Sequence, residues 1–222
     1  MLRLRLQRPE RLNALTLSLA RDLLAAIERA NADDSVRVVL LCGEGRAFCA
    51  GKDRDDAATG EFVDVLQRVA AALMDSPKPV VGAAQGWAVG AGLELLLNCD
   101  IVVAARNAQF KLPEVASGLF VTGGAAALLP RAIGLPRAKG VLMLGEPFTA
   151  EQALAWGLVW EVVDDARLEA RSLAIATHLA LGDRGILADA KRLLHRESIG
   201  ELDGVLQREA VVHAVLMRKL VL

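Results

Sequence analysis

The sequence lacks several features that mark particular classes of protein. Its 222 residues include no tyrosine, three tryptophans and five phenylalanines, so a pocket lined by aromatic rings is not expected. It has no surplus of charge, because 26 basic side chains stand against 27 acidic ones and the formal net charge is -1. That balance excludes a nucleic-acid binder held by bulk positive charge. Charges interrupt every long apolar stretch, so no segment supplies the ~20 apolar residues of a membrane-spanning helix.

Cysteine and histidine are scarce and scattered. The three cysteines, Cys42, Cys49 and Cys99, are odd in number and far apart, and no CxxC or Cys/His ligand spacing occurs. We interpret them as reduced thiols that pack like small apolar side chains. His178 and His195 lie on Arg- and Ala-rich helical stretches, as expected for solvated helix faces. Neither a histidine-based triad nor a metal site is predicted.

What the sequence does contain is a large apolar fraction. Hydrophobic residues make up 54% of the chain, which is enough for a sizeable core in one large domain or two small ones. The first residues, Met1 to Leu6, alternate leucine and arginine, whereas a signal peptide needs a continuous apolar run. These observations predict a soluble, cytoplasmic protein.

Short apolar runs alternate with helical patterns in the first half of the chain, and helices dominate after Gly123. Strands are predicted over Leu2 to Leu6, Val36 to Cys42, Val80 to Ala84, Ile101 to Ala105 and Val159 to Val163. Helices are predicted over Ser18 to Ala30 (Ser18 being a possible cap), Glu61 to Met74, Leu93 to Asn98, Ala125 to Ile133, Pro136 to Leu144, Ala150 to Trp156, Ala166 to Leu181, Arg184 to His195 and Gly200 to Leu220. Thr149 and Gln152 fit a capping box. This order indicates an α/β fold with a helical extension.

The glycine-rich segments do not fit phosphate-binding loops. Gly51-Lys52 is followed by aspartate, and no glycine lies five residues before Gly51, so the Walker pattern fails. Gly90-Ala91-Gly92 has no third glycine at position 95, so the dinucleotide pattern fails as well. Tight turns at strand ends are the simpler interpretation.

Two glutamates are candidates for acid/base chemistry. Glu94 lies among leucines in an apolar helix, where burial disfavours the charged form and raises the pKa. Glu114 follows Leu112-Pro113 in a loop, with Lys111 as a possible partner. Each could be a salt-bridged structural residue. Together, two carboxylates that face one small space form a general acid/base arrangement.

These residues belong to a series of segments that resembles the crotonase superfamily, the enoyl-CoA hydratase/isomerase family. The matching segments keep the family's order and cover nearly all of residues 7 to 165: Arg8 to Leu15, Arg46 to Asp53, Pro77 to Val81, Gly86 to Leu95, Cys99 to Ile101, Phe110 to Glu114, Gly118 to Arg131, Ala150 to Ala153 and Trp156 to Val159. The resemblance implies a ClpP/crotonase-like spiral of ββα units. It also implies that residues 1–135 form the core with an acyl-CoA site. Residues 136–222 would then form a helical trimerisation region, in a homotrimer or dimer of trimers.

The resemblance also implies a chemistry. The backbone N–H groups of Lys52 and Ala91 would hold the thioester oxygen, Glu94 would orient and deprotonate water, and Glu114 would exchange the proton at the α-carbon. Contacts to coenzyme A, which enters as part of the substrate and not as a separate cofactor, are implied for Arg11, Ala47, Phe48, Ala50, Lys52, Asp53 and Ala91. The family's usual lysine shortly after the first oxyanion position is replaced by Asp55.

The expected activity is hydration of an enoyl-CoA, because family hydratases carry both glutamates. The alternatives are a double-bond isomerase, including the phenylacetate-pathway type that lacks this pair, and a non-catalytic homologue. The chain is shorter than the family pattern, since the leading strand and the final helix have no counterpart. Pocket closure and oligomeric state are therefore left open, and the sequence indicates no acyl chain length or pathway.

Overall fold

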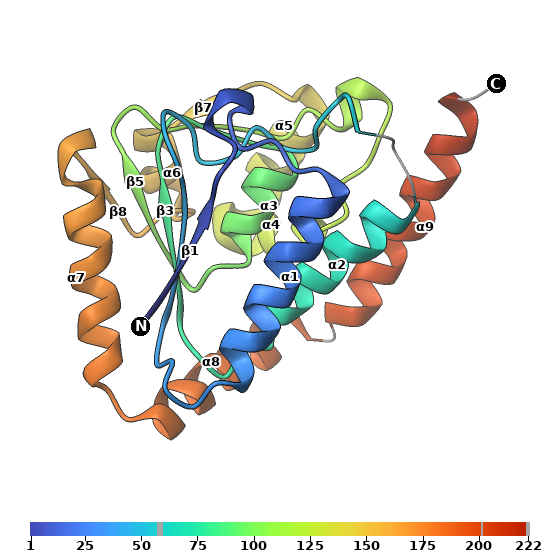
Figure 1. The fold of residues 1–222 in the computed structure, drawn as a ribbon. Helices are drawn as coiled ribbons and strands as arrows, with labels where there is room; N and C mark the ends of the chain where they lie inside the picture. The colour runs from blue at the N-terminus through green and yellow to red at the C-terminus, as the bar shows by residue number, and fades with distance from the viewer. Residues whose placement is uncertain (57–59, 201, 221–222) are drawn as a thin grey trace.

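The computed structural model describes residues 1–56, 60–200 and 202–220 (Figure 1). Its strands are β1 (Leu2–Leu6), β2 (Val39–Gly43), β3 (Val80–Ala84), β4 (Trp87–Val89), β5 (Ile101–Ala105), β6 (Gln109–Lys111), β7 (Phe148–Thr149) and β8 (Glu161–Val163). Its helices are α1 (Leu17–Ala32), α2 (Gly60–Met74), α3 (Ala91–Leu97), α4 (Ala125–Ile133), α5 (Leu135–Leu144), α6 (Ala150–Trp156), α7 (Leu168–Leu181), α8 (Arg184–Ile199) and α9 (Leu202–Leu220). Short 3-10 turns lie at Pro9–Arg11, Val115–Ser117 and Asp165–Arg167.

Two sheets organise the fold. The larger sheet is parallel, with strand order β1-β2-β3-β5-β8. The smaller sheet has the order β4-β6-β7, in which β4 and β6 are parallel and β7 is antiparallel. Strands β3 and β5 lie in the larger sheet, and the strands that follow them, β4 and β6, lie in the smaller one. The chain therefore winds from one sheet to the other as it advances.

Both faces of the larger sheet are buried. Alternate residues of β2 face opposite sides, so that Val39 and Leu41 pack in the main core while Leu40 packs with Ile175 and Ala176 of α7. In Figure 1, α7 covers one face, and α1, α2 and α3 lie on the other. Burial on both faces explains why the sequences of these strands are continuous runs of apolar residues.

The C-terminal helices return to the main core. Helix α9 runs beside α2 and also contacts α4, as Figure 1 shows for α2. No helix among the described residues is both long enough and apolar enough to cross a membrane.

The predicted α/β architecture with a parallel sheet and C-terminal helices is confirmed. Two details of the prediction are wrong. Helix α1 is capped by Thr16 instead of Ser18, because Thr16 is extended and its hydroxyl accepts the Leu19 N–H. Strands β4, β6 and β7 were not predicted. The capping box of Thr149 and Gln152 is confirmed. The division at residues 135 and 136 stays a prediction.

Candidate active site

A cavity of about 670 Å³ lies between the loops that follow the sheets and helix α9. Residues 50–54 and 89–91 form one side, and residues 113–122 contribute the loop that carries Glu114. The first turns of α2 form the next wall, and Ala210, His213, Ala214 and Met217 of α9 complete it. Segments far apart in the sequence therefore meet at this cavity.

Two backbone N–H groups are unpaired at the cavity wall. Lys52 forms a bridge with Leu15, in which Gly51 O accepts the Leu15 N–H at 2.7 Å and Leu15 O accepts the Asp53 N–H at 2.8 Å. The N–H of Lys52 therefore points away from Leu15. Ala91 begins α3, so its N–H has no acceptor within the helix. Neither N–H has a hydrogen-bond acceptor among the described residues. Two free donors flank one space, as an oxyanion hole requires.

Two glycines bring these donors together. Gly51 has φ +87°, and a Cβ there would lie 2.6 Å from Val89 O and 3.7 Å from Ala91 N. Gly90 has φ +54°, and a Cβ there would lie 2.5 Å from Glu114 Oε1. A side chain at either position would combine an unfavourable backbone conformation with a steric clash.

Glu94 is a buried carboxyl in the first turn of α3, with 2% of its surface exposed. Its Oε1 accepts hydrogen bonds from Thr122 N at 2.9 Å and Gly123 N at 2.7 Å. Its Oε2 bonds no described residue and is not an enclosed atom, so solvent reaches it. Burial is the main cause that raises the pKa of Glu94, and the charges of Glu114 and Glu209 raise it further.

Glu114 lies just before the Val115–Ser117 turn and lines the cavity. Its Oε2 is enclosed and has no hydrogen-bond partner among the described residues. Burial raises the pKa of Glu114 as well. The Lys111 side chain, the partner suggested by the sequence, forms no ion pair with it in the part of the chain described. Both glutamates therefore offer an unpaired oxygen, and repulsion makes the second ionisation of the pair the harder one.

A third carboxylate, not found by sequence reasoning, supports the first two. Glu209 of α9 accepts the N–H groups of Gly124 at 2.7 Å and Ala126 at 2.8 Å and so caps α4. Asn98 Nδ2 donates to Gly123 O at 2.8 Å. The loop that binds Glu94 is thus held from α3 and α9 at once.

The other sequence-predicted residues divide between the cavity and its surroundings. Ala50, Lys52, Asp53 and Ala91 line the cavity, whereas Ala47 and Phe48 are buried and do not line it. Arg11 does not line it.

Arg11 is held by two carboxylates. Its guanidinium donates to Asp53 at 3.2 Å and also to Asp55. Arg8 donates to the other oxygen of Asp53 at 2.9 Å. The Asp55 N–H, Arg8 and Arg11 hold the pKa of Asp53 below its ordinary value. Arg54 lines the cavity and has no carboxylate partner among the described residues. Lys52 has none there either, but its ammonium donates to the backbone carbonyls of Asp53 and Asp56.

The cavity contains more aromatic surface than the composition suggested. Phe62 and Phe120 line it, and the Lys52 ammonium lies 5.4 Å from the centre of the Phe62 ring. His213, which the sequence gave no reason to single out, also lines it and bonds Phe120 O. None of the tryptophans does, and Trp156 instead packs on Phe148.

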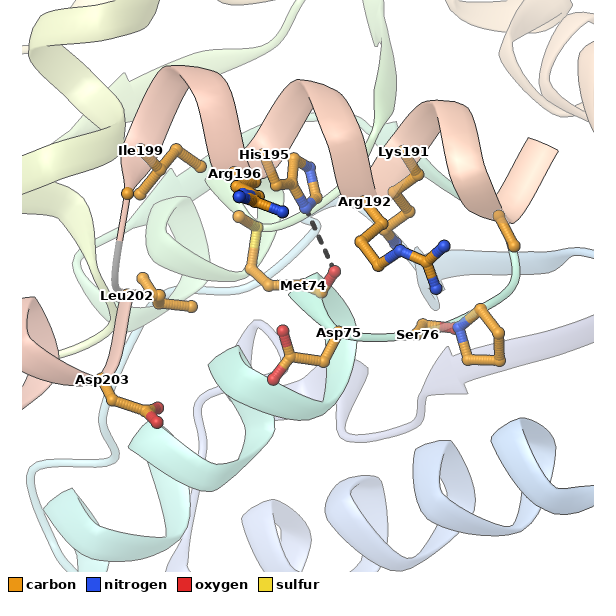
Figure 2. A pocket seen from close by; sticks show the side chains of 13 residues that line it. Met74, Asp75, Ser76, Lys191, Arg192, His195, Arg196, Ile199, Leu202 and Asp203 are labelled. Carbon is orange, nitrogen blue, oxygen red and sulfur yellow. Dashed lines mark hydrogen bonds between the residues drawn. The ribbon is translucent and has the colours of Figure 1, made fainter. Parts of the chain in front are cut away.

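A second cavity, also of about 670 Å³, lies between α8 and the end of α2 (Figure 2). His195 points to Met74 O across it at 3.2 Å, the contact drawn dashed in Figure 2. Lys191 pairs with Asp100 at 2.9 Å and also donates to Leu73 O. The acids of this cavity that form no ion pair within the described part of the chain, Asp75 and Asp203, are exposed, so the cavity has no counterpart of the buried, unpaired carboxyl of Glu114. No cluster of potential metal ligands occurs among the described residues.

The raised pKa of Glu94 predicts a pH-dependent stability. The unfolded chain ionises this carboxyl from about pH 4.5 upward, whereas the folded chain resists ionisation, so the free energy of unfolding falls as pH rises from there to the raised value. Glu94→Gln removes this loss, since one amide oxygen can accept both backbone N–H groups. We expect the variant to gain on the order of a few kcal/mol relative to wild type between about pH 5 and about pH 9.

Urea unfolding of Glu94→Gln and wild type at about pH 5 and about pH 9 measures this difference in the free energy of unfolding. Glu146→Gln at an exposed position is the matched control and should follow wild type. Parallel stability curves for Glu94→Gln and wild type would show that Glu94 ionises normally.

Comparison with known proteins gives one consistent result. The sequence model described as "Enoyl-CoA hydratase/isomerase" matches residues 1–220. The 1,2-epoxyphenylacetyl-CoA isomerase of Escherichia coli is 38% identical over 216 residues, which cover 93% of this chain and 82% of that protein. A probable enoyl-CoA hydratase of Rhodobacter capsulatus is 37% identical, with 92% of this chain and 81% of that protein covered.

A solved structure agrees with these relatives. The crystal structure of an enoyl-CoA hydratase from Mycobacterium avium subsp. paratuberculosis superposes with a TM-score of 0.91 at 35% identity, over 97% of this chain and 88% of that one. An acyl-CoA substrate fits such a family. The chain therefore belongs to the enoyl-CoA hydratase/isomerase family of the crotonase superfamily and has its fold.

Proposed function

We propose that this protein is an enoyl-CoA hydratase that adds water across the 2,3 double bond of an enoyl-CoA thioester. One observation carries the proposal: the carboxyl groups of Glu94 and Glu114 each keep an oxygen without a partner among the described residues, and Glu114 lines the same cavity as Lys52 and Ala91 with their two free backbone donors. Glu94 is not itself a lining residue and lies three residues after Ala91 in α3. Two carboxyls with raised pKa values that share one proton can hold a water between a charged acceptor and a neutral donor, and a single carboxyl cannot be both at once.

The chain's own groups account for each step. The thioester carbonyl lies against the N–H groups of Lys52 and Ala91, which stabilise the negative charge that develops on its oxygen. Glu94 has the more strongly raised pKa of the two, so the reacting state is the one in which the single proton of the pair has moved to Glu114. Glu94, then ionised, takes a proton from water as the water oxygen bonds to the β-carbon. Glu114, in its protonated form, then gives its proton to the α-carbon.

The protons balance over one turnover. Water loses one proton to Glu94 and the α-carbon gains one from Glu114, so the product contains one added water. Transfer of a proton from Glu94 to Glu114 restores the starting state. Because repulsion disfavours two charges, the pair keeps one proton over a wide pH range.

Arg54 is proposed to contact a phosphate of coenzyme A, because it lines the cavity without a carboxylate partner while Arg11 is neutralised by Asp53 and Asp55. Arg54→Glu is expected to raise KM about tenfold with little change in kcat, and the effect should shrink at high salt. Steady-state kinetics at two ionic strengths measure it. Arg29→Glu on the exposed face of α1 carries the same charge change and should leave KM unaltered. An equal rise in both variants would assign the effect to net charge.

Double-bond isomerisation is the second candidate, because the description of the matching family model includes isomerases of enoyl-CoA. The relative at 38% identity is named an isomerase of an epoxide and does not itself favour this reaction. Moving a double bond needs a group that removes one proton from the substrate and returns it at another carbon. Glu114 alone meets that requirement. Glu94 would then serve only to hold the loop at Thr122 and Gly123.

The deciding experiment follows the loss of enoyl-thioester absorbance with short, medium and aromatic enoyl-CoAs. Hydration of any of them supports the proposal. Failure to hydrate the whole panel, combined with a shift of a 3-enoyl double bond, would favour the isomerase. Binding without either reaction would favour a non-catalytic homologue.

We further propose a cytoplasmic homotrimer in which the helical region packs on neighbouring subunits. Helix α5 supports this assembly, since Leu135, Met143 and Leu144 leave 55–67% of their surfaces exposed. Light scattering gives the mass in solution, and a monomer at assay concentration would contradict the trimer.

A further inference from the structure

One face of α9 contacts the N-terminus of α4 and also lines the cavity. Glu209, His213 and Met217 are spaced four residues apart and therefore share this face. Glu209 is bound to the N-terminus of α4, whereas His213 and Met217 line the cavity. The capping bonds of Glu209 fix the register of α9, so the position of His213 is set by the same helix that holds the loop bound to Glu94.

The hydrogen bond of His213 fixes which ring nitrogen carries the proton. Nδ1 lies 2.8 Å from Phe120 O. A carbonyl oxygen only accepts, so Nδ1 must be the donor. In the neutral ring, Nε2 is then unprotonated and presents a lone pair as a hydrogen-bond acceptor.

This acceptor belongs to a residue that lines the cavity, and solvent reaches it. Nε2 has no hydrogen-bond partner among the described residues and is not an enclosed atom. The side chains beside it on the cavity wall, Leu119, Phe120 and Met217, are apolar. A single polar atom in an apolar wall is the usual means by which a pocket orients a ligand and selects its chemistry.

We propose that His213 is a specificity-determining residue that selects acyl groups carrying a hydroxyl beyond carbon 3, with the hydroxyl donating its hydrogen bond to Nε2. The inference rests on the proposed use of this cavity for the acyl-CoA. In the mechanism above, the oxygen on carbon 3 comes from the water held by Glu94 and Glu114. A carboxylate on the acyl chain has no hydrogen to donate to the Nε2 lone pair, so it cannot form this bond.

Binding of unreactive substrate analogues tests the inference without requiring turnover. Calorimetry with saturated butanoyl-, hexanoyl- and octanoyl-CoA is compared with the same compounds carrying a hydroxyl at carbon 3 or at the terminal carbon. We expect at least one terminal hydroxyl compound to bind about tenfold more tightly than its parent, the increment of one neutral hydrogen bond made in a partly desolvated site.

Three variants separate recognition from structure. His213→Asn can still donate to Phe120 O but has no acceptor at the Nε2 position, whereas His213→Gln places an amide oxygen near that position. His213→Leu removes both. The preference for the hydroxyl should vanish in His213→Asn and His213→Leu and persist in part in His213→Gln. His178→Asn, at an exposed position on α7, should keep the full preference.

Several results would overturn the inference: no preference at any chain length, a preference confined to the carbon 3 hydroxyl, a preference that survives in His213→Asn, or no binding of any compound. Hydration of the unsubstituted enoyl-CoAs is followed in parallel. If the wild-type protein hydrates none of the enoyl-CoAs but prefers the hydroxyl compounds, the proposed function alone is contradicted. If it hydrates them but shows no such preference, this inference alone is contradicted.

Discussion

Replacement of Glu114 by glutamine is expected to lower kcat for hydration about a thousandfold, within the range that positioned acid/base groups provide. Glutamine has the same shape, but its amide can neither deliver a proton to the α-carbon nor take one up. Glu114 Oε2 has no protein partner among the described residues, so the substitution breaks no hydrogen bond of that atom. The loss should therefore appear in kcat, with KM close to that of wild type. Thermal stability should be no lower than that of wild type, because burial raises the pKa of Glu114 and the amide does not ionise.

The role of Glu114 at the α-carbon can be measured separately. A saturated acyl-CoA in deuterated water exchanges its α-proton only through the acid/base group, and NMR follows that exchange. Glu114→Gln should abolish the exchange, and Glu94→Gln should retain part of it while losing hydration. Glu146→Gln serves again as the exposed control. Full hydration in Glu94→Gln would leave Glu114 as the sole catalytic carboxyl and would contradict the two-carboxyl mechanism.

The parts of this site that the sequence predicted are those with a strong local signal. Strands over Val80–Ala84 and Ile101–Ala105 were predicted to the residue, because burial on both faces leaves continuous runs of small and β-branched side chains. Glu94 was identified because a carboxyl flanked by leucines is costly unless it has a role or a partner.

The parts that escaped prediction depend on distant partners or on very short elements. Glu209 bonds a residue 85 positions away and His213 one 93 positions away, so nothing beside them in the sequence signals their roles. Both sit in an amphipathic helix where a polar residue is ordinary. Arg11 was assigned a contact to coenzyme A by resemblance, and its pairing with Asp53 is a contact that only the folded chain reveals. Strands of two or three residues, such as β7, are too short to show a period.

Gly90→Ala is expected to lower kcat about a hundredfold or more, although the substitution adds a single methyl group. That carbon would lie 2.5 Å from Glu114 Oε1, closer than any stable contact, and the backbone at φ +54° and ψ -124° disfavours every residue except glycine. The expected result is a displaced Glu114 and a shifted Ala91 N–H, together with a loss of roughly 1–3 kcal/mol of stability. Gly140→Ala, in α5 with open space around it, is the control and should not lose stability.

A double-mutant cycle then shows whether the methyl group acts through Glu114. If displacement of that carboxyl is the main effect, Gly90→Ala should cost far less in a Glu114→Gln background than in wild type, because the group it disturbs has already lost its function. Equal costs in both backgrounds would instead assign the effect to the oxyanion donor at Ala91, since that donor acts whether or not residue 114 can transfer a proton. The two contributions of the Gly90 turn, to the acid/base group and to the oxyanion hole, are thereby separated by one additional variant.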